Sequence, residues 1–490
     1  MKKYIIIGLV VCSYQLAAQN ISDAVRYSFL PQLTTARSIG VGGSMSPVGA
    51  DISVASNNPA GIAEYRKSEF VIGFGIPTNS ADAEFAGITE TENKTRFQVN
   101  SLGMVFAYRP DNPKLRTMNL SIGINKMADF TQNIFYGGST PGTRTERFLE
   151  VSNLRTLDEL DDFEGGLAFD TELIFDTNAD NIYESDFFTF NEVLYKEEFI
   201  ERSGSLKELF VNLAANYDNK LSFGLTLGIP ILNYTETKTY LEADDVFGVD
   251  NFLDFIYTQS LSTTGGGINL KGGVIYKATP KVRISAAIHS PSWYFLTDEF
   301  DTSLDFRLDG EETGLLAESP ISEFDYRLRT PWRALAGIGL IYSLGDIKGF
   351  LSGEVEYVDY SGSSFDITVN SNDPVDQFFE EDLNNELTNN LTSGLNYRIG
   401  TELALSKFRI RVGGGMFQSP YVNSNLLDID LQLNGGIGYR GNRFYVDLSY
   451  NTRNQSEQYT PYRLLDTSNN QTVAINNTIS QIGLTVGFKM

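Results

Sequence analysis

The residue types that most often do chemistry in enzymes are scarce in this chain. His289 is the only histidine among 490 residues, and Cys12 is the only cysteine. A Ser–His–acid hydrolase needs a carboxylate that orients its histidine, and the sequence identifies no such partner for His289. One histidine cannot form a multi-histidine metal site, and one cysteine forms no disulfide within the chain. The sequence therefore predicts no enzyme, no metal centre and no cofactor. It predicts that His289 is a structural residue of the protein wall with its hydrogen bonds satisfied.

Alternation of apolar with polar or small residues dominates the chain and is clearest at its end. The last apolar set is Ile482, Leu484, Val486, Phe488 and Met490. A period of two places successive side chains on opposite faces of a strand. Repeated segments of about ten such residues, separated by turns, are typical of a transmembrane β-barrel. We therefore predict an all-β fold, an antiparallel transmembrane barrel of about fourteen strands in an outer membrane, in contact with its lipid and glycolipid.

Short turns and long acidic connections alternate along the chain. The long connections are expected at 79–97, 131–205, 241–265, 311–325, 361–391, 419–429 and 456–477. A barrel with short periplasmic turns and long extracellular loops produces this order. A soluble β-sandwich or β-helix would also alternate, but it explains the asymmetry of the connections less well.

The two ends of the chain differ in character. Lys2-Lys3, an apolar run and Ala17-Ala18 predict a signal peptide over 1–18. Residues 19–66 lack the alternation and form a predicted N-terminal plug, and 67–490 form the barrel, with 131–205 as its largest outer loop. The net charge of −24 excludes nucleic acid as a partner.

Charged residues on the lumenal parity of the strands are expected to pair across neighbouring strands. A charge facing lipid at mid-depth would cost about 2–4 kcal/mol, so these residues must face inward. The polar wall predicted in this way includes His289, Arg398, Glu402, Arg409 and Arg411, with Glu354 and Glu356 as further acidic members.

The plug sequence resembles the FadL/TodX family of outer-membrane transporters for hydrophobic compounds. The resemblance rests on Ala36-Arg37-Ser38-x-Gly40-x-Gly42-Gly43, on Asp51 after small residues, and on Asn58-Pro59-Ala60 just before the first strand. It implies a fourteen-stranded barrel with an internal hatch. It also implies gating by Arg37, Gly42, Asp51, Asn58, Pro59 and Ala60, and an exit through the wall beside a kinked third strand. The residues are compatible with this, because Pro59 fixes a bend and Asn58 can bond its own backbone.

A cluster of large apolar residues in the second outer loop needs either burial or a ligand. Its candidate capture residues are Phe187, Phe188, Phe190, Leu194 and Phe199. Packing onto the barrel rim and a ligand groove are both open interpretations. The length and acidity of this loop, and Met490 as the final residue, depart from the family pattern.

These observations together predict a passive outer-membrane channel for hydrophobic small molecules such as long-chain fatty acids or aromatic hydrocarbons. Four alternatives stay open at this point: a secretion or assembly component with a periplasmic partner, haem-type uptake through His289, a general porin and a lumenal hydrolase. The plug argues against the porin, because a general porin has none.

Overall fold

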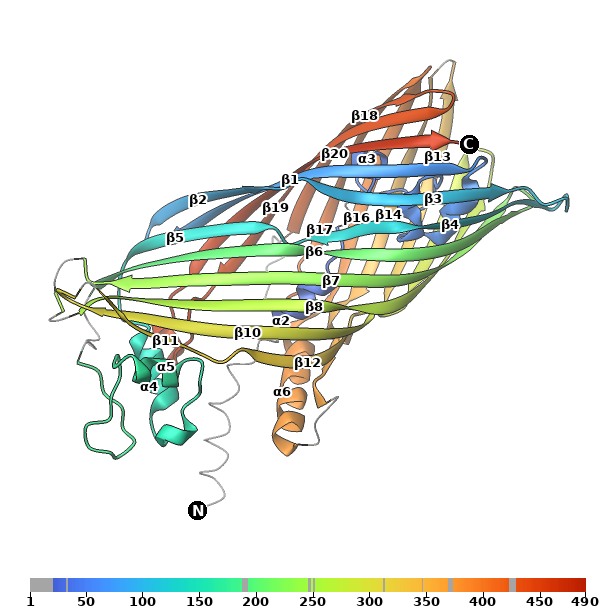
Figure 1. The fold of residues 1–490 in the computed structure, drawn as a ribbon. Helices are drawn as coiled ribbons and strands as arrows, with labels where there is room; N and C mark the ends of the chain where they lie inside the picture. Colours follow the sequence, from blue (N-terminus) through green and yellow to red (C-terminus); the bar gives the residue numbers. More distant parts are fainter. Residues whose placement is uncertain are drawn as a thin grey trace.

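The computed structural model describes residues 21–31, 34–186, 193–245, 248–249, 252–311, 313–345, 347–368, 373–422 and 429–490. Antiparallel strands form one closed wall (Figure 1), in which β1 pairs with β20 from Glu69 opposite Lys489 to Glu84 opposite Ala474. The wall has fourteen strands, as the alternation predicted. The predicted signal peptide lies outside the described residues.

The wall is built from twenty strand segments, several of which are two parts of one interrupted strand. The segments are β1 (Glu69–Phe85), β2 (Ile88–Thr95), β3 (Gln98–Tyr108), β4 (Leu115–Asp129), β5 (Gln132–Pro141), β6 (Val193–Tyr217), β7 (Leu221–Ala243), β8 (Phe252–Lys277), β9 (Val282–His289), β10 (Trp293–Leu308), β11 (Leu315–Glu318), β12 (Ser322–Arg329), β13 (Arg333–Leu344), β14 (Ile347–Asp359), β15 (Ser364–Asp366), β16 (Ser393–Leu405), β17 (Phe408–Gln418), β18 (Ile429–Arg440), β19 (Phe444–Tyr459) and β20 (Val473–Lys489). Pairing shows that β2 continues into β3, β4 into β5, β9 into β10 and β12 into β13.

The helices lie inside the lumen or at the outer end, and all those described except α6, which has 17 residues, are short. They are α2 (Ile21–Ser28), α3 (Ala36–Gly40), η2 (Ile52–Ala55), η3 (Pro59–Glu64), α4 (Thr145–Ser152), η4 (Leu157–Glu159), α5 (Gly165–Asp170), η5 (Tyr360–Gly362), α6 (Pro374–Asn390) and η7 (Thr467–Asn469). Among the described residues, no helix is long and apolar enough to cross a membrane.

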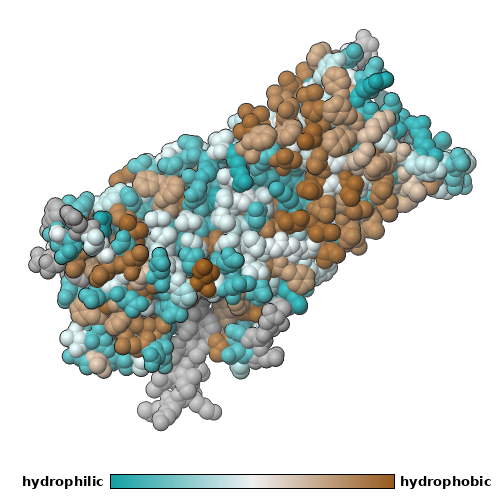
Figure 2. All heavy atoms as spheres, in the orientation of Figure 1, coloured by the Kyte–Doolittle hydropathy of each residue, from teal (hydrophilic) through white to brown (hydrophobic). Residues whose placement is uncertain are grey.

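Apolar side chains cover only part of the outer wall. Figure 2 shows them on the half of the barrel nearer the C-terminus, while the other half is largely hydrophilic on this face. In β7, which has 23 residues, Leu221 to Ile231 expose apolar side chains, whereas Asn233 and Thr235 are exposed beyond them. A membrane strand needs only about 9–11 residues. The strands therefore extend well beyond the bilayer.

This extension makes the outer loops shorter than expected. Residues 79–85 and 88–95, much of 252–265 and residues 193–205 are strand rather than loop. The physical reason is that a strand outside the bilayer meets water on its outer face. That face is then polar, and the apolar alternation that marks a membrane strand weakens.

Residues 34–66, called the plug below, fill the half of the lumen nearer the C-terminus. Val41, Ile52, Val54 and Ile62 belong to a buried cluster that includes Val71 and Phe210 of the wall. The helix α2 lies in a second apolar cluster with residues of β6, β7, β10, β12 and α6. The helices α4 and α5 pack in a third cluster, at the end away from the C-terminus (Figure 1).

Candidate functional site

The turn Asn58-Pro59-Ala60 starts the last helix of the plug. Asn58 is the N-cap of η3, and its Oδ1 accepts a hydrogen bond of 3.2 Å from the backbone N–H of Ala60. Pro59 occupies the first helical turn, where its missing N–H has no partner to lose. The expected bond from Asn58 to its own backbone is thus present. The amide nitrogen of Asn58 donates to Ser46 Oγ at 3.0 Å and to the wall carbonyl of Val274 at 3.3 Å.

Glycines in the wall allow this turn to press against the barrel. A Cβ atom added at Gly273 would lie 3.0 Å from Asn58 Cγ and 3.2 Å from Pro59 Cδ, and it would overlap Asn58 Oδ1. A Cβ atom at Gly224, the partner of Gly273 across the β7–β8 ladder, would overlap the backbone of Pro59. The turn therefore depends on two facing glycines that motif reasoning did not identify.

Gly42 makes the same kind of close approach on the opposite side of the plug. Its φ is +65°, and a Cβ atom there would lie 2.8 Å from the backbone N and O of Gly414. Added Cβ atoms at Gly400 and Gly413 would overlap Val41. The glycine run at 413–415 thus marks close backbone approach, as expected for glycines inside a strand.

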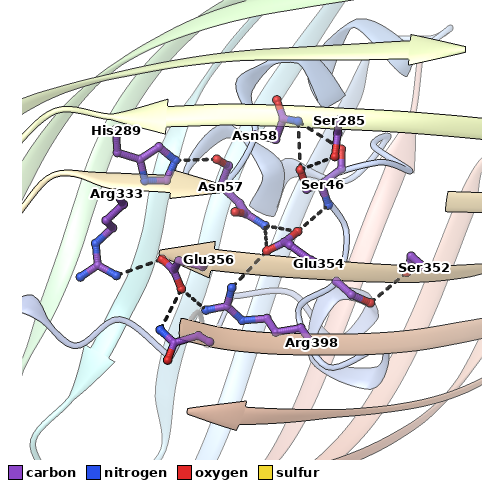
Figure 3. A network of polar contacts seen from close by, with 12 residues as sticks. Ser46, Asn57, Asn58, Ser285, His289, Arg333, Ser352, Glu354, Glu356 and Arg398 are labelled. Carbon is purple, nitrogen blue, oxygen red and sulfur yellow. Dashed lines mark hydrogen bonds and ion pairs between the residues drawn. The ribbon is translucent and has the colours of Figure 1, made fainter. Parts of the chain in front are cut away.

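A buried polar network joins the plug to the wall (Figure 3). Arg398 donates to Glu354 at 3.1 Å and to Glu356 at 2.6 Å, and Arg333 donates to Glu356 at 3.0 Å. Glu354 also accepts from the plug, through the backbone N–H of Ser46 at 3.2 Å and the side chain of Asn57 at 3.4 Å. Inward-facing charges on neighbouring strands are paired here. The same network also holds the plug to the wall, because Glu354 accepts hydrogen bonds from both.

A second polar network holds the start of the plug. Arg37 donates to Glu402 at 3.1 Å and to the carbonyl of Ala50 at 2.7 Å. Glu402 also accepts from Arg411 at 2.7 Å, and Arg411 donates to Asp447 at 2.8 Å. Arg409, another residue of the predicted polar wall, lies farther away, with its Nε 4.0 Å from Glu402 Oε1.

Asp51 caps a short helix within the plug. Its Oδ1 accepts from the backbone N–H of Ser53 at 3.1 Å and from the hydroxyl of Thr35 at 2.7 Å. Asp51 therefore fixes the fold of the plug itself, whereas Arg37 and Glu402 fix its position in the lumen.

His289 bonds to the plug and is satisfied. It is 5% exposed, and its Nε2 donates to the carbonyl oxygen of Asn57 at 2.6 Å. Among the described residues, no group of three or more His, Cys, Asp or Glu side chains is arranged to hold a metal ion. His289 points into the lumen, where it contacts the plug.

The candidate capture residues are not brought together where they are described. Leu194 is 4% exposed and packs in the outer cluster with Phe148 and Tyr240. Phe199 lies on the opposite face of β6 and is 36% exposed. Phe187, Phe188 and Phe190 lie outside the described residues. Leu194 is therefore packed in the outer cluster, and it forms no common groove with Phe199.

The third wall strand is interrupted. The β3–β4 ladder ends at Ser101 opposite Asn125, and the β4–β6 register shifts between Lys126 and Ala128. Lys126 turns inward, is 3% exposed and bonds to Gln98 and Asp129. Within the described chain, β2 and β5 form no ladder with each other. A gap in the wall pairing therefore lies beside the third strand, where the β4–β6 register shifts.

The part of β6 that extends beyond the apolar band carries buried charges in the outer lumen. Burial lowers the pKa of Lys196 to about 8, although nearby Glu242 acts in the opposite direction. Its amine donates to the carbonyl and hydroxyl oxygens of Thr140 at 2.8 and 2.9 Å. Burial raises the pKa of Glu198, which accepts from Tyr136 at 2.7 Å. These contacts tie β5 to β6 outside the membrane.

Besides the two facing glycines, sequence reasoning missed four polar residues of the site. Arg333 follows Pro331, which breaks the strand and hides its parity, and Asn57 acts through contacts that only the fold brings about. Glu208 pairs with Lys271 in the lumen. The alternation of β6 and β8 is the signal that could have placed this last pair inside.

Comparison with known proteins identifies the fold. No family model and no curated protein sequence matches the chain. The solved structure of the toluene transporter TbuX of Ralstonia pickettii matches with a TM-score of 0.50 and 14% identity, covering 94% of this chain and 99% of that chain. A FadL homologue of Pseudomonas aeruginosa matches with a TM-score of 0.52 and 12% identity over the same shares. The chain therefore has the fold of the FadL-type barrels, and the resemblance seen in the plug is confirmed at the level of architecture.

Proposed function

We propose that this protein is a passive outer-membrane channel for hydrophobic small molecules. The observation that carries the proposal is the apolar interior of the barrel between the plug and the outer cluster that contains α4 and α5. Tyr294, Leu296, Tyr326 and Leu328 point inward and are each at most 2% exposed, because they pack in one apolar cluster with α2. The lumen of a water-filled porin is polar, so an apolar lumen favours an apolar cargo. The structural neighbours include a protein described as a toluene transporter.

The mechanism follows from where the polar and apolar regions lie. Ligand enters from the outer end, partitions into the apolar lumen and meets the plug, whose charged contacts close the way to the periplasm. Exit then needs either a shift of the plug or an opening in the wall. The interruption of the third strand at 129–132 is the wall opening that the family resemblance implies.

Two of the alternative functions find little support in this site. Haem-type uptake requires an available imidazole, but the Nε2 of His289 is committed to Asn57 at 2.6 Å. A general porin requires an unobstructed lumen, but the plug is bonded to the wall on several sides. We therefore propose neither.

Uptake of radiolabelled naphthalene by cells that produce the protein tests the proposal. Producing cells should take up the compound faster than cells with the empty vector at low concentration. A variant lacking residues 21–60 should remain a closed barrel, because β1 and β20 pair directly, and it should also conduct ions in planar bilayers. Equal uptake with and without the protein would contradict the proposed function, whatever the conductance.

A further inference from the structure

The wall has a second interruption, on the side away from the third strand, where two neighbouring strands break at the same height. His289 pairs with Arg333, and Trp293 pairs with Arg329. Between these pairs, residues 290–292 and 330–332 are outside the ladder, and each segment contains a proline, Pro291 or Pro331. Proline cannot donate to a ladder and is rare inside central strands. Two adjacent prolines on neighbouring strands therefore indicate that the interruption of the ladder is encoded in the sequence.

Few contacts close this break. The backbone N–H of Thr330 donates to the carbonyl of Ser292 at 3.0 Å, and the N–H of Ser292 donates to Thr330 Oγ1 at 2.9 Å. On the other edge of 330–332, pairing with β14 ends at Arg333 and resumes with β15 at Arg329. The segment 330–332 thus lies between two interruptions, and these two hydrogen bonds join it to the neighbouring strand.

The break lies at the outer edge of the apolar band. Below it, Ile288 and Ile338 are exposed to lipid, at 60% and 59%. Above it, the outward residues of β12 are charged and exposed: Glu323, Asp325, Arg327 and Arg329. Trp293 and Trp332, the only two tryptophans in the chain, are 45% and 40% exposed; Trp293 immediately follows the first break, and Trp332 is the last residue of the second. Tryptophan is enriched at the membrane–water interface, so the break opens toward the outer leaflet.

A cavity lies directly behind the break. Ser290, Ser292, Thr330 and Pro331 line it from the wall. The rest of its lining combines apolar and polar residues. The apolar ones include Leu206 and the rings of Tyr27 and Tyr294, the charged ones are Glu208, Lys271 and Arg333, and His289 is a further polar one that is already bonded to Asn57.

The charges of this cavity are already paired. Lys271 pairs with Glu208, and Arg333 pairs with Glu356 at 3.0 Å. An anionic ligand would therefore have to compete with a carboxylate for each cation. The chemistry fits a neutral, mostly apolar molecule better than a carboxylate.

We propose that this proline break is a side portal, through which neutral apolar molecules pass between the lumenal cavity and the outer leaflet of the membrane. The proposal rests on the proposed function and deepens it, because it assigns a second passage and a ligand class. The portal differs in place from the gap at the third strand. Opening it requires the loss of the two Ser292–Thr330 hydrogen bonds and no further ladder bond between β9/β10 and β12/β13.

Reversible disulfide staples test the portal. The portal staple is Ser292→Cys with Thr330→Cys, made in a Cys12→Ser background. The matched control is Ile284→Cys with Ile338→Cys, a directly paired position within the regular β9–β13 ladder. A third variant, Gln98→Cys with Lys126→Cys, staples the gap at the third strand. Each variant is compared in its oxidised and reduced forms for naphthalene uptake, with barrel closure checked by heat-modifiable migration on gels.

The oxidised portal staple should lower naphthalene uptake at least tenfold, and reduction should restore it, while the control staple has no effect. Unchanged uptake in the oxidised portal staple would overturn the portal and leave the proposed function standing. Block by the third-strand staple alone would do the same. Absence of uptake by the parent protein would instead overturn the proposed function.

A second measurement does not depend on cysteine substitution. The intrinsic tryptophan fluorescence of the protein comes only from Trp293 and Trp332. In vesicles, 1-bromonaphthalene should quench it in a saturable way, because the ligand occupies a site beside both rings. Quenching that rises linearly with bromonaphthalene, as for a tryptophan in free contact with lipid, would contradict the portal.

Discussion

Replacing Gly273 by alanine should loosen the plug and leave the barrel closed. The new Cβ atom would overlap Asn58 Oδ1 and lie 3.2 Å from Pro59 Cδ. The wall strand cannot retreat, because Gly273 pairs with Gly224 on one side and with Ala287 on the other. The turn of the plug is held to the wall at this point by the 3.3 Å bond from Asn58 to Val274. The turn therefore has to move.

The magnitude follows from the cost of overpacking. Forcing an extra methyl group into a packed contact costs about 1–3 kcal/mol. If moving the turn relieves that cost, the equilibrium between a seated and a displaced plug shifts by about 5- to 150-fold. The parent lumen is obstructed, so even a small displaced population should raise the ion conductance.

The neighbouring position provides a matched control. Gly272 faces the opposite side of β8, and a Cβ atom there would have no atom within 4 Å. Both variants change glycine to alanine in the same strand, so any effect on strand propensity is shared. Single-channel conductance in planar bilayers should rise for Gly273→Ala and stay at the parental level for Gly272→Ala. Equal conductance of the two variants would refute the close-approach argument.

Three further predictions concern other parts of the molecule. Glu354→Ala removes the acceptor that Arg398 and Ser46 share and should destabilise the plug–wall contact by about 3–5 kcal/mol. The temperature of the heat-modifiable transition on gels should fall. The control Glu323→Ala, at an exposed position, should leave that temperature unchanged. Asp158→Cys should be labelled by an impermeant maleimide on intact cells and Asn442→Cys should not; strong labelling at 442 would reverse the topology. Lys196→Met should raise the melting temperature of the protein at about pH 7. The pKa of the Lys196 amine is about 8 in the folded state, below its value in the unfolded chain, so the buried amine is charged at pH 7 and this charge is unfavourable. That gain should shrink as the pH rises above 8 and the folded amine loses its proton, and a gain that grows with pH would contradict it.

The features that could be predicted are those that a period of two constrains directly. A charge in lipid is costly, so each strand residue can face only one side of the wall. This rule places the alternate residues from Leu221 to Ile231 outward and Glu354, Glu356 and Arg398 inward. The capping bond of Asn58 follows from local geometry, because an asparagine before a helical proline can reach the next free N–H. Neither inference requires knowledge of distant contacts.

The features that escaped prediction depend on a partner far away in the chain or on a break in the period. His289 is separated by 232 positions from its acceptor Asn57. Arg333 follows a proline that interrupts its strand, so the parity before the break does not carry through. Asn233 and Thr235 lie on a strand outside the bilayer, where water replaces lipid and the outward residues are no longer apolar. The last case also explains why outer loops were expected where the structure has strands.

Both parts of the N-terminal segment pack against apolar wall residues, but the plug makes more polar contacts to the wall than α2 does. The plug contacts the wall through an apolar cluster that includes Val71 and Phe210 and also through polar groups such as Arg37, Asn57 and Asn58. Buried ion pairs add little net stability relative to apolar packing, but breaking one is costly, so they specify one position of the plug. The helix α2 contacts the wall through apolar packing of Ala24 and Tyr27 and through a hydrogen bond from Arg333 to the carbonyl oxygen of Ser28. The cavity lies between these two regions. An apolar molecule in it can pack against Tyr27 and Leu30, but it cannot make the hydrogen bonds that Lys271, His289 and Arg333 make.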